Sequence, residues 1–215
     1  MRAEFEPVAS APRDFYRLLT ALVTPRPIAW VSSRSPEGVD NLAPHSFFTV
    51  VASDPPMVAF SSVGRKDTLR NVKATGEFVV NLTTAALTEQ VNLTGTDFPP
   101  ELSEFDTVGL GREPSVRVAP PRVSDAPAAL ECVVHTLVEL GDSTLVIGRV
   151  LVAAVAEEVM VDGHPDINLL RPMARLGKDE WSEIGEVRSL ARVRYRDWSE
   201  QAGPGPEGST SREGS

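Results

Sequence analysis

Residues 130–155 read LECVVHTLVELGDSTLVIGRVLVAAV and carry the strongest β-strand pattern in the chain. Two long apolar runs, 130–140 and 144–155, stand on either side of Gly141-Asp142-Ser143. A Gly-Asp pair between two strand-forming runs is typical of a β-hairpin turn. The stretch therefore predicts a long antiparallel hairpin, to which the rest of the fold can be related.

Between the N-terminus and this hairpin, the sequence predicts short strands, tight turns and few helices. Helices are expected at 13–23, ended by Pro25, and at 67–75, closed by Gly76. Strands are expected at 27–33, 57–63 and 77–82, with a turn at 35–38. This pattern favours a mainly β fold, a closed antiparallel barrel with peripheral helices, over a doubly wound α/β sheet.

The composition narrows the class of protein. The net charge of −9 argues against a nucleic-acid partner, because phosphate backbones are bound by clustered Lys and Arg. The chain has no apolar run of about 18 residues, so no membrane span is predicted. A single cysteine, Cys132, rules out an intrachain disulfide and fits a cytoplasmic location. Residues 1–200 are expected to form one domain, and the Gly, Ser and Pro-rich segment 201–215 is expected to be disordered.

Two segments near the N-terminus could hold a flat heteroaromatic ring. In Arg26-Pro27-Ile28-Ala29-Trp30-Val31-Ser32, the small Ala29 leaves room beside a strand. In Asn41-Leu42-Ala43-Pro44-His45-Ser46, polar side chains and backbone groups could meet the polar edge of such a ring. The first segment also fits a plain edge strand. The two phenylalanines that follow the second segment, at 47 and 48, could wall a pocket or fill the core, and the core is the expected place for aromatic side chains.

The segment Ser61-Ser62-Val63-Gly64-Arg65-Lys66-Asp67-Thr68 leads from a strand through two cations into a helix. Helix N-termini attract phosphate through free N–H groups and the helix dipole. Lysine, arginine and hydroxyl donors add to this, whereas the spacing is not that of a P-loop. The segment predicts a site for one monophosphate, with Asp67 as the helix N-cap, although a solvated surface turn would have the same sequence.

The motifs TPRPIAWVSS, NLAPHSFF, SDPPMVAFSS, KDTLRN and TGEFVVNL, in this order, resemble the flavin reductase-like, FMN-binding split-barrel family. The branch that it is most similar to contains reductase components of two-component monooxygenases and flavoredoxins. The resemblance extends over about residues 10–195, through Leu130-Glu131-Cys132 and Ile147-Gly148 to Arg171-Pro172-Met173-Ala174-Arg175-Leu176-Gly177. It implies a six-stranded antiparallel split β-barrel, a homodimer, and FMN bound near the dimer interface in a cradle between Thr24 and Thr68.

Carried over position by position, the resemblance assigns cofactor-binding roles to four groups of residues. The ring would be lined by Arg26, Pro27, Ile28, Ala29, Trp30 and Ser32, and its polar edge met by Asn41, Ala43, Pro44 and Ser46. The phosphate and ribityl chain would be held by Ser61, Ser62, Lys66 and Thr68. A C-terminal segment closing the site, across the dimer or within one chain, would contribute Arg171, Arg175, Leu176, Gly177 and Trp181.

One departure from the family concerns the turn before the last long strand. Members with reductase activity commonly have Gly-Asp-His there, and the histidine is associated with the flavin and the nicotinamide. Here the third residue is Ser143, which neither stacks nor titrates near neutral pH. His45 is the candidate catalytic residue that could compensate. His135 and His164 read as strand and turn residues, Cys132 as a small buried side chain, and no metal site is predicted.

The resemblance implies an NAD(P)H:flavin reductase that supplies reduced FMN to a partner monooxygenase. Two alternatives stay open at the level of the sequence. One is an FMN enzyme that oxidises or oxygenates its own small organic substrate, which the Ser143 departure motivates. The other is a flavin electron carrier without enzymatic activity. The electron donor, NADH or NADPH, is not distinguished by the sequence.

Overall fold

A computed structural model describes residues 1–202, and it separates them into two units, Met1–Ile184 and a second that begins at Gly185. The predicted tail, 201–215, lies outside the described residues except for its first two. That a single FMN-binding domain extends to residue 200 stays a prediction. None of the helices within residues 1–202 is long and apolar enough to cross a membrane.

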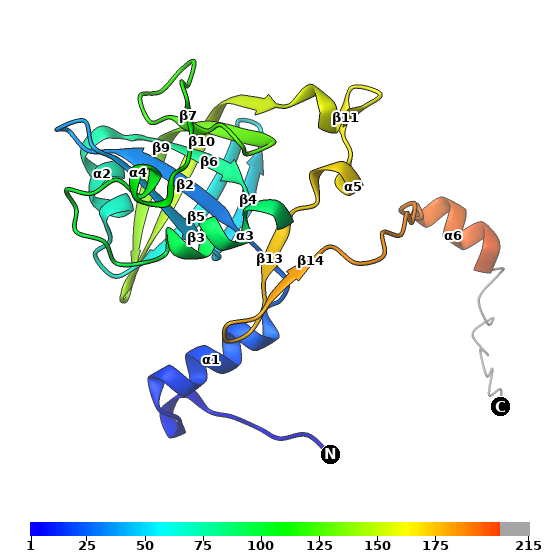
Figure 1. Cartoon of the computed structure of the whole chain (residues 1–215). Coiled ribbons are helices and arrows are strands. Elements are labelled where there is room, and N and C mark those ends of the chain that lie inside the picture. Colours follow the sequence, from blue (N-terminus) through cyan, green and yellow to red (C-terminus); the bar gives the residue numbers. More distant parts are fainter. Residues whose placement is uncertain (203–215) are drawn as a thin grey trace, which may run out of the picture. The chain divides into compact units, whose positions relative to one another are not determined.

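The first unit contains almost all of the secondary structure (Figure 1). Its helices are η1 (Pro7–Ala9), α1 (Pro12–Leu22), α2 (Asp67–Thr75), η2 (Ala85–Leu87), α3 (Thr88–Leu93), α4 (Glu104–Val108), η3 (Glu157–Val159) and α5 (Ile167–Leu170). Its longer strands are β2 (Ala29–Arg34), β3 (Asp40–His45), β4 (Phe48–Ser53), β5 (Pro56–Val63), β6 (Glu77–Leu82), β9 (Ala128–Leu140) and β10 (Ser143–Val155). Its short strands are β1 (Arg26–Pro27), β7 (Arg112–Glu113), β8 (Arg122–Val123), β11 (Met160–Val161), β12 (His164–Pro165), β13 (Met173–Arg175) and β14 (Trp181–Glu183). The second unit contributes α6 (Tyr195–Ala202).

The seven longer strands form one antiparallel sheet in the order β3-β2-β6-β9-β10-β5-β4. The predicted mainly β fold with peripheral helices is confirmed, although this sheet has seven strands rather than six. The predicted hairpin is β9–β10, whose turn is Gly141-Asp142 with Gly141 at φ +62°. Gly76 closes α2 in the left-handed conformation, as expected.

The sheet curls back on itself at the corner between β3 and β4. The chain runs from β3 through Ser46 and Phe47 directly into β4, which pairs with β5 at the other end of the sheet order. The Phe47 carbonyl accepts a hydrogen bond of 2.9 Å from the Ser61 amide of β5. The first and last strands of the sheet are therefore consecutive in the chain, and the corner brings them together.

Two larger apolar clusters, and a smaller one around Val79, Val118 and Ala129, hold the sheet and its helices. The inner one includes Val31, Phe60, Phe78 and Val146, with Leu69 and Val72 contributed by α2. The outer one contains Ile28, Trp30, Leu42, Leu87, Val91, Phe105, Leu110 and Val123 and lies under α3 and α4. Strand β2 supplies side chains to both clusters, so it is buried on both faces.

Cys132 of β9 is a buried free thiol within the inner cluster, as predicted. Burial raises the pKa of this thiol to about 12, so it remains a neutral packing residue at physiological pH.

Replacement of Gly148 by alanine is expected to destabilise the fold by about 1–3 kcal/mol. Gly148 lies at a bulge in β10, and a Cβ atom there would come within 2.6 Å of Phe78 Cε1 and 3.3 Å of Cys132 Cβ. Urea unfolding of Gly148→Ala and the wild type measures the difference. Gly185→Ala is the control, because a Cβ at Gly185 meets nothing within 4 Å, and equal stability of all three proteins would contradict the prediction.

Candidate functional site

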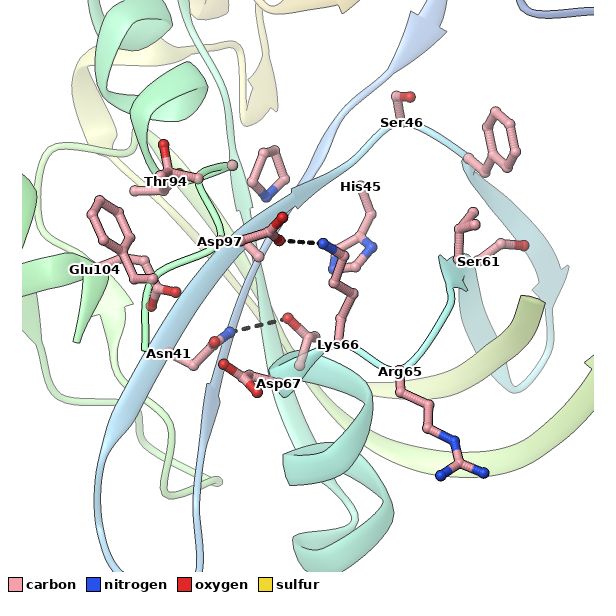
Figure 2. A pocket seen from close by; sticks show the side chains of 18 of the residues that line it. Asn41, His45, Ser46, Ser61, Arg65, Lys66, Asp67, Thr94, Asp97 and Glu104 are labelled. Carbon is pink, nitrogen blue, oxygen red and sulfur yellow. Dashed lines mark hydrogen bonds and ion pairs between the residues drawn. The ribbon is translucent and has the colours of Figure 1, made fainter. Parts of the chain in front are cut away.

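A cavity of about 440 Å³ opens between β3, the start of α2 and the segment that follows α3 (Figure 2). Its lining residues are Tyr16, Asn41, Ala43, Pro44, His45, Ser46, Phe47, Ser61, Val63, Arg65, Lys66, Asp67, Thr68, Thr94, Gly95, Thr96, Asp97, Phe98, Pro100 and Glu104. This volume is within the range of sites for cofactors and drug-sized ligands. The cavity brings together eight predicted site residues: Asn41, Ala43, Pro44, His45, Ser46, Ser61, Lys66 and Thr68.

Strand β3 forms one wall of the cavity. Alternation along the strand places Asn41, Ala43 and His45 on one face, whereas Leu42 points into the outer cluster. Pro44 is tolerated because β3 is the outermost strand on its side of the sheet. The Asn41 amide donates a hydrogen bond of 3.0 Å to the Thr68 hydroxyl of α2, which fixes the strand against the helix.

His45 ends β3 and is buried, with 8% of its surface exposed. Its ring packs against Phe60 with the centroids 4.7 Å apart, and its Nε2 atom has no hydrogen-bond partner among the described residues. The pKa of His45 is lowered to about 4, chiefly by burial and to a smaller extent by the charge of Lys66, against the raising effect of a hydrogen bond with the Ser61 backbone. The imidazole is therefore neutral at physiological pH, and its Nε2 atom is buried without a partner among the described residues.

The positive end of the cavity is the turn into α2. Gly64 adopts φ +71°, and Arg65 and Lys66 follow directly before the helix. The prediction that Asp67 is the N-cap was wrong: Lys66 occupies that position, and Asp67, in the first turn, forms a 2.7 Å ion pair with Arg70. No side chain caps the helix, so the N–H groups of its first turn stay available to an anion.

Ser61 and Ser62 cannot both face the cavity, because successive side chains of a strand point to opposite faces. Ser61 lines the cavity. Ser62 points to the same face as Phe60 of the core, is fully buried, and its hydroxyl has no partner in the described part of the chain. The predicted role of Ser62 is therefore not supported in this geometry.

Three parts of the cavity were missed by sequence reasoning. Tyr16 comes from α1 and lies near Phe47, with ring centroids 6.3 Å apart. The segment 94–100, after α3, supplies a wall in which Gly95 lies against Pro44. Phe47 itself is 36% exposed beside the cavity, so the expectation that both phenylalanines fill the core holds only for Phe48.

Glu104 is the third part of the cavity that sequence reasoning missed, and it lines the cavity next to β3. One carboxylate oxygen accepts a 2.8 Å hydrogen bond from the Leu42 amide, and the residue is 6% exposed. Burial raises the pKa of Glu104 above its usual value, and the nearby charge of Asp67 raises it further, against the effect of the backbone hydrogen bonds. A Ser-Glu-Phe run at a helix start was the only signal of it in the sequence.

The predicted ring-lining segment 26–32 does not line the cavity. Ala29, Trp30 and Ser32 are fully buried because β2 is a central strand covered on both faces, and Ile28 belongs to the outer cluster. The Trp30 indole donates to the Thr94 hydroxyl at 2.8 Å, and the Ser32 hydroxyl donates to the Pro121 carbonyl at 2.5 Å. These side chains lie behind the cavity wall, and their cofactor-binding roles stay a prediction.

Arg26 and Pro27 form the short strand β1, and the Arg26 side chain is hydrogen-bonded to main-chain groups away from the cavity. Its guanidinium donates to the carbonyls of Thr20 and Val23 at the end of α1 and to that of Leu176. Desolvation lowers the pKa of Arg26, and the guanidinium remains charged as arginine does in proteins. Arg26 thus ties α1 to the C-terminal hairpin β13–β14.

The predicted C-terminal residues gather outside the cavity of their own chain. The Arg175 guanidinium stacks on the Trp181 ring at 4.7 Å from its centroid, and Gly177 lies against Ala21 of α1. Leu176 accepts from Arg26, and Arg171 pairs with Glu183 at 2.7 Å. A role of these residues in binding would require a second copy of the chain.

Ser143 opens β10 opposite Val63, a cavity residue, and the adjacent Asp142 carbonyl accepts a 2.9 Å hydrogen bond from Gly64. The Ser143 hydroxyl bonds to the Asp142 carboxylate instead of facing the cavity. Within residues 1–202, no three His, Cys, Asp or Glu side chains are grouped as metal ligands.

Comparison with known proteins gave one family model and several similar structures. The model described as "Flavin reductase like domain" matches residues 21–166. Nitrilotriacetate monooxygenase component B from Bacillus cereus is 34% identical, with a TM-score of 0.86 over 88% of this chain and 99% of that one. The 2-nitrobenzoate 2-nitroreductase NbaA of Pseudomonas fluorescens is 30% identical, with a TM-score of 0.84 over 90% and 98% of the two chains. An NADH-dependent FAD reductase of Streptomyces globisporus is 34% identical over 49% of this chain and 58% of its own length.

Acidification is expected to destabilise the fold through His45. The pKa of the imidazole is about 4 in the folded chain against 6.5 ordinarily, so folding favours the neutral form. The contribution of His45 to stability is complete above pH 6.5 and falls by on the order of 3 kcal/mol as the pH drops toward 4. Urea unfolding across this range measures it.

Carboxylates also titrate in this range, so variants are needed to isolate the histidine. His45→Gln should lose stability less steeply than the wild type as the pH falls. His135→Gln, which alters an exposed histidine of β9, should keep the wild-type slope. A wild-type slope in His45→Gln would show that His45 is not the group responsible.

Proposed function

Because the chain belongs to the flavin reductase-like family, we propose that it reduces flavin mononucleotide with NADH or NADPH and delivers the reduced flavin to a partner monooxygenase. The observation that carries the proposal is the cavity itself. Its lining combines neutral aromatic side chains, Tyr16 and Phe47, with the cationic N-terminus of helix α2. The similarity to a component B of a monooxygenase supports the existence of a second component.

The cationic end suits a phosphate monoester. Lys66 and Arg65 supply positive charge, the first turn of α2 supplies N–H donors, and Ser61 adds a hydroxyl. This donor set would hold one phosphate group, which favours FMN over a dinucleotide. Whether FAD is also accepted is decided by binding measurements with both flavins.

The other end suits a ring with alternating donors and acceptors. Ser46 and His45 would meet its polar edge, while Phe47 and Pro44 would contact its apolar part. Asn41, predicted for the same edge, is bonded to Thr68 of α2 and therefore lies near the phosphate end. When bound, a flavin supplies the redox chemistry that no side chain can supply. The chain binds and orients the ring and excludes water from it.

His45 is best described as a neutral hydrogen-bonding partner for the ring. Its low pKa means that it does not carry a positive charge near neutral pH. It would hold its proton at one ring nitrogen and offer the other to the ligand, depending on the tautomer. Ser143 does not take over this role, because its hydroxyl is turned to Asp142.

A homodimer is supported by apolar surface that the single chain leaves uncovered. Helix α1 buries only Thr20, while its Leu19 and Leu22 and the following Val23 are exposed, and β4 exposes Val50 and Val51. An amphipathic helix normally covers its apolar stripe against another surface. We assign that surface to a second copy, which would also bring the C-terminal hairpin toward the neighbouring site. A cytoplasmic location is proposed together with this function.

A second candidate function is supported by a specific comparison. The similarity to a nitroreductase of Pseudomonas fluorescens, together with serine at position 143, favours an FMN enzyme that acts on its own organic substrate. Such an enzyme would retain its flavin through turnover instead of releasing it.

The purified protein is expected to show a flavin absorption spectrum, intrinsically or after addition of FMN, that bleaches with NADH or NADPH without oxygen. Equilibrium dialysis then separates the candidates, because a reductase for a partner exchanges FMN with solvent whereas the second candidate holds it stoichiometrically. Bound flavin that neither nicotinamide reduces would overturn the reductase and leave the electron carrier.

Val50→Glu is expected to convert the dimer into a monomer, because a charge would be buried at the proposed interface. Size-exclusion chromatography with light scattering measures the mass. Val116→Glu is the matched control: both valines are 72% exposed, but Val116 lies in the loop between β7 and β8. A wild-type chain that is already monomeric, or a dimer that tolerates glutamate at position 50, would contradict the interface.

A further inference from the structure

The cation expected to hold the phosphate already has an acidic partner. The Lys66 ammonium forms an ion pair and hydrogen bond with the Asp97 carboxylate across the cavity (Figure 2). Both residues line the cavity. The neighbouring Arg65 points away from this pair in Figure 2 and forms no ion pair within residues 1–202.

Asp97 is presented by a segment that is anchored to the core. The Thr94 hydroxyl at the start of this segment accepts from the Trp30 indole at 2.8 Å and donates to the Val91 carbonyl at 2.9 Å. Gly95 packs against Pro44, and the amides of Thr96 and Phe98 donate to the carbonyls of Leu93 and Thr96, respectively. The position of the carboxylate at the cavity mouth therefore follows from the fold.

The pair is charged and exchangeable at neutral pH. The hydrogen bond and the positive charge of Lys66 lower the pKa of Asp97, so the carboxylate is ionised. Its side chain is 84% exposed and that of Lys66 is 52% exposed. Exposed pairs of this kind are weak, so a dianionic phosphate can displace the carboxylate at a modest cost.

We propose that Asp97 competes with the phosphate group of the flavin for Lys66 and thereby keeps the flavin loosely bound. The inference rests on the proposed function, since it assigns the same ammonium to the phosphate. A carboxylate beside a phosphate also repels it directly, which adds to the competition. Loose binding suits a reductase whose product must leave for a partner.

Asp97→Asn tests the proposal, because it removes the charge while keeping the size of the side chain. The variant is expected to bind FMN about three- to tenfold more tightly than the wild type, mostly through slower dissociation. Riboflavin, which has the same ring and ribityl chain without the phosphate, should bind both proteins equally. Quenching of flavin fluorescence gives the affinities, and stopped-flow displacement gives the dissociation rates.

Glu101→Gln is the matched control. Glu101 is an exposed acid directly after segment 94–100, does not line the cavity, and has no ion pair in the described part of the chain. It changes the net charge by the same amount and should leave the affinity for FMN unchanged. An equal gain in Glu101→Gln would assign the effect to net charge and overturn the proposal.

The remaining outcomes separate this inference from the proposed function. Unchanged or weaker FMN binding by Asp97→Asn, or a parallel gain for riboflavin, would overturn the role of Asp97 while leaving the reductase intact. A wild-type chain that binds neither flavin would overturn the proposed function. Inorganic phosphate, titrated by calorimetry into both proteins, would then test the competition for Lys66, and equal affinities would overturn it.

Discussion

The main-chain hydrogen bond between the Ser61 amide and the Phe47 carbonyl is the interaction on which the site depends. It fixes the corner at which β3 turns into β4, and β4 then pairs with β5 at the far end of the sheet order. Because the corner closes the sheet, the end of β3 and the end of β5 lie together. His45 on one strand and Ser61 on the other therefore face one cavity, and the turn after β5 delivers Lys66 to its mouth.

Much of this could be predicted from local sequence. The hairpin β9–β10, helix α2 with its glycine cap, and the polar face of β3 each follow from a pattern within a few residues. The segment proposed to bind a phosphate was also recognised locally, because a strand, a glycine and two cations before a helix form one short motif. Within this segment, the Ser62 hydroxyl does not line the cavity, because strand alternation turns it to the opposite face from Ser61.

The rest depended on contacts between distant segments. The segment 26–32 looks the same whether its strand is central or peripheral, and only the docking of α3 and α4 shows that Trp30 is enclosed. Segment 94–100 reaches the cavity because Thr94 is bonded to that same tryptophan. Tyr16 arrives through α1, whose position is held by Arg26. Each of these contacts joins residues that are far apart in the chain, so no pattern of neighbouring residues in the sequence predicts it.

Burial separates the ion pairs that build the fold from the pair at the cavity. Glu131 is fully buried and receives hydrogen bonds from Arg122 and from the amides of Val116 and Arg117, so losing one partner would leave a charge stranded in the core. Lys66 and Asp97 are exposed, so each charge can be hydrated by water or can pair with a new partner. The buried pair of Arg122 and Glu131 therefore stays formed in the folded chain, whereas the exposed pair of Lys66 and Asp97 can exchange one partner for a ligand. A cavity that combines a neutral histidine with an exchangeable cation can orient a ring firmly while holding its phosphate weakly, as a reductase that releases its flavin to a partner requires.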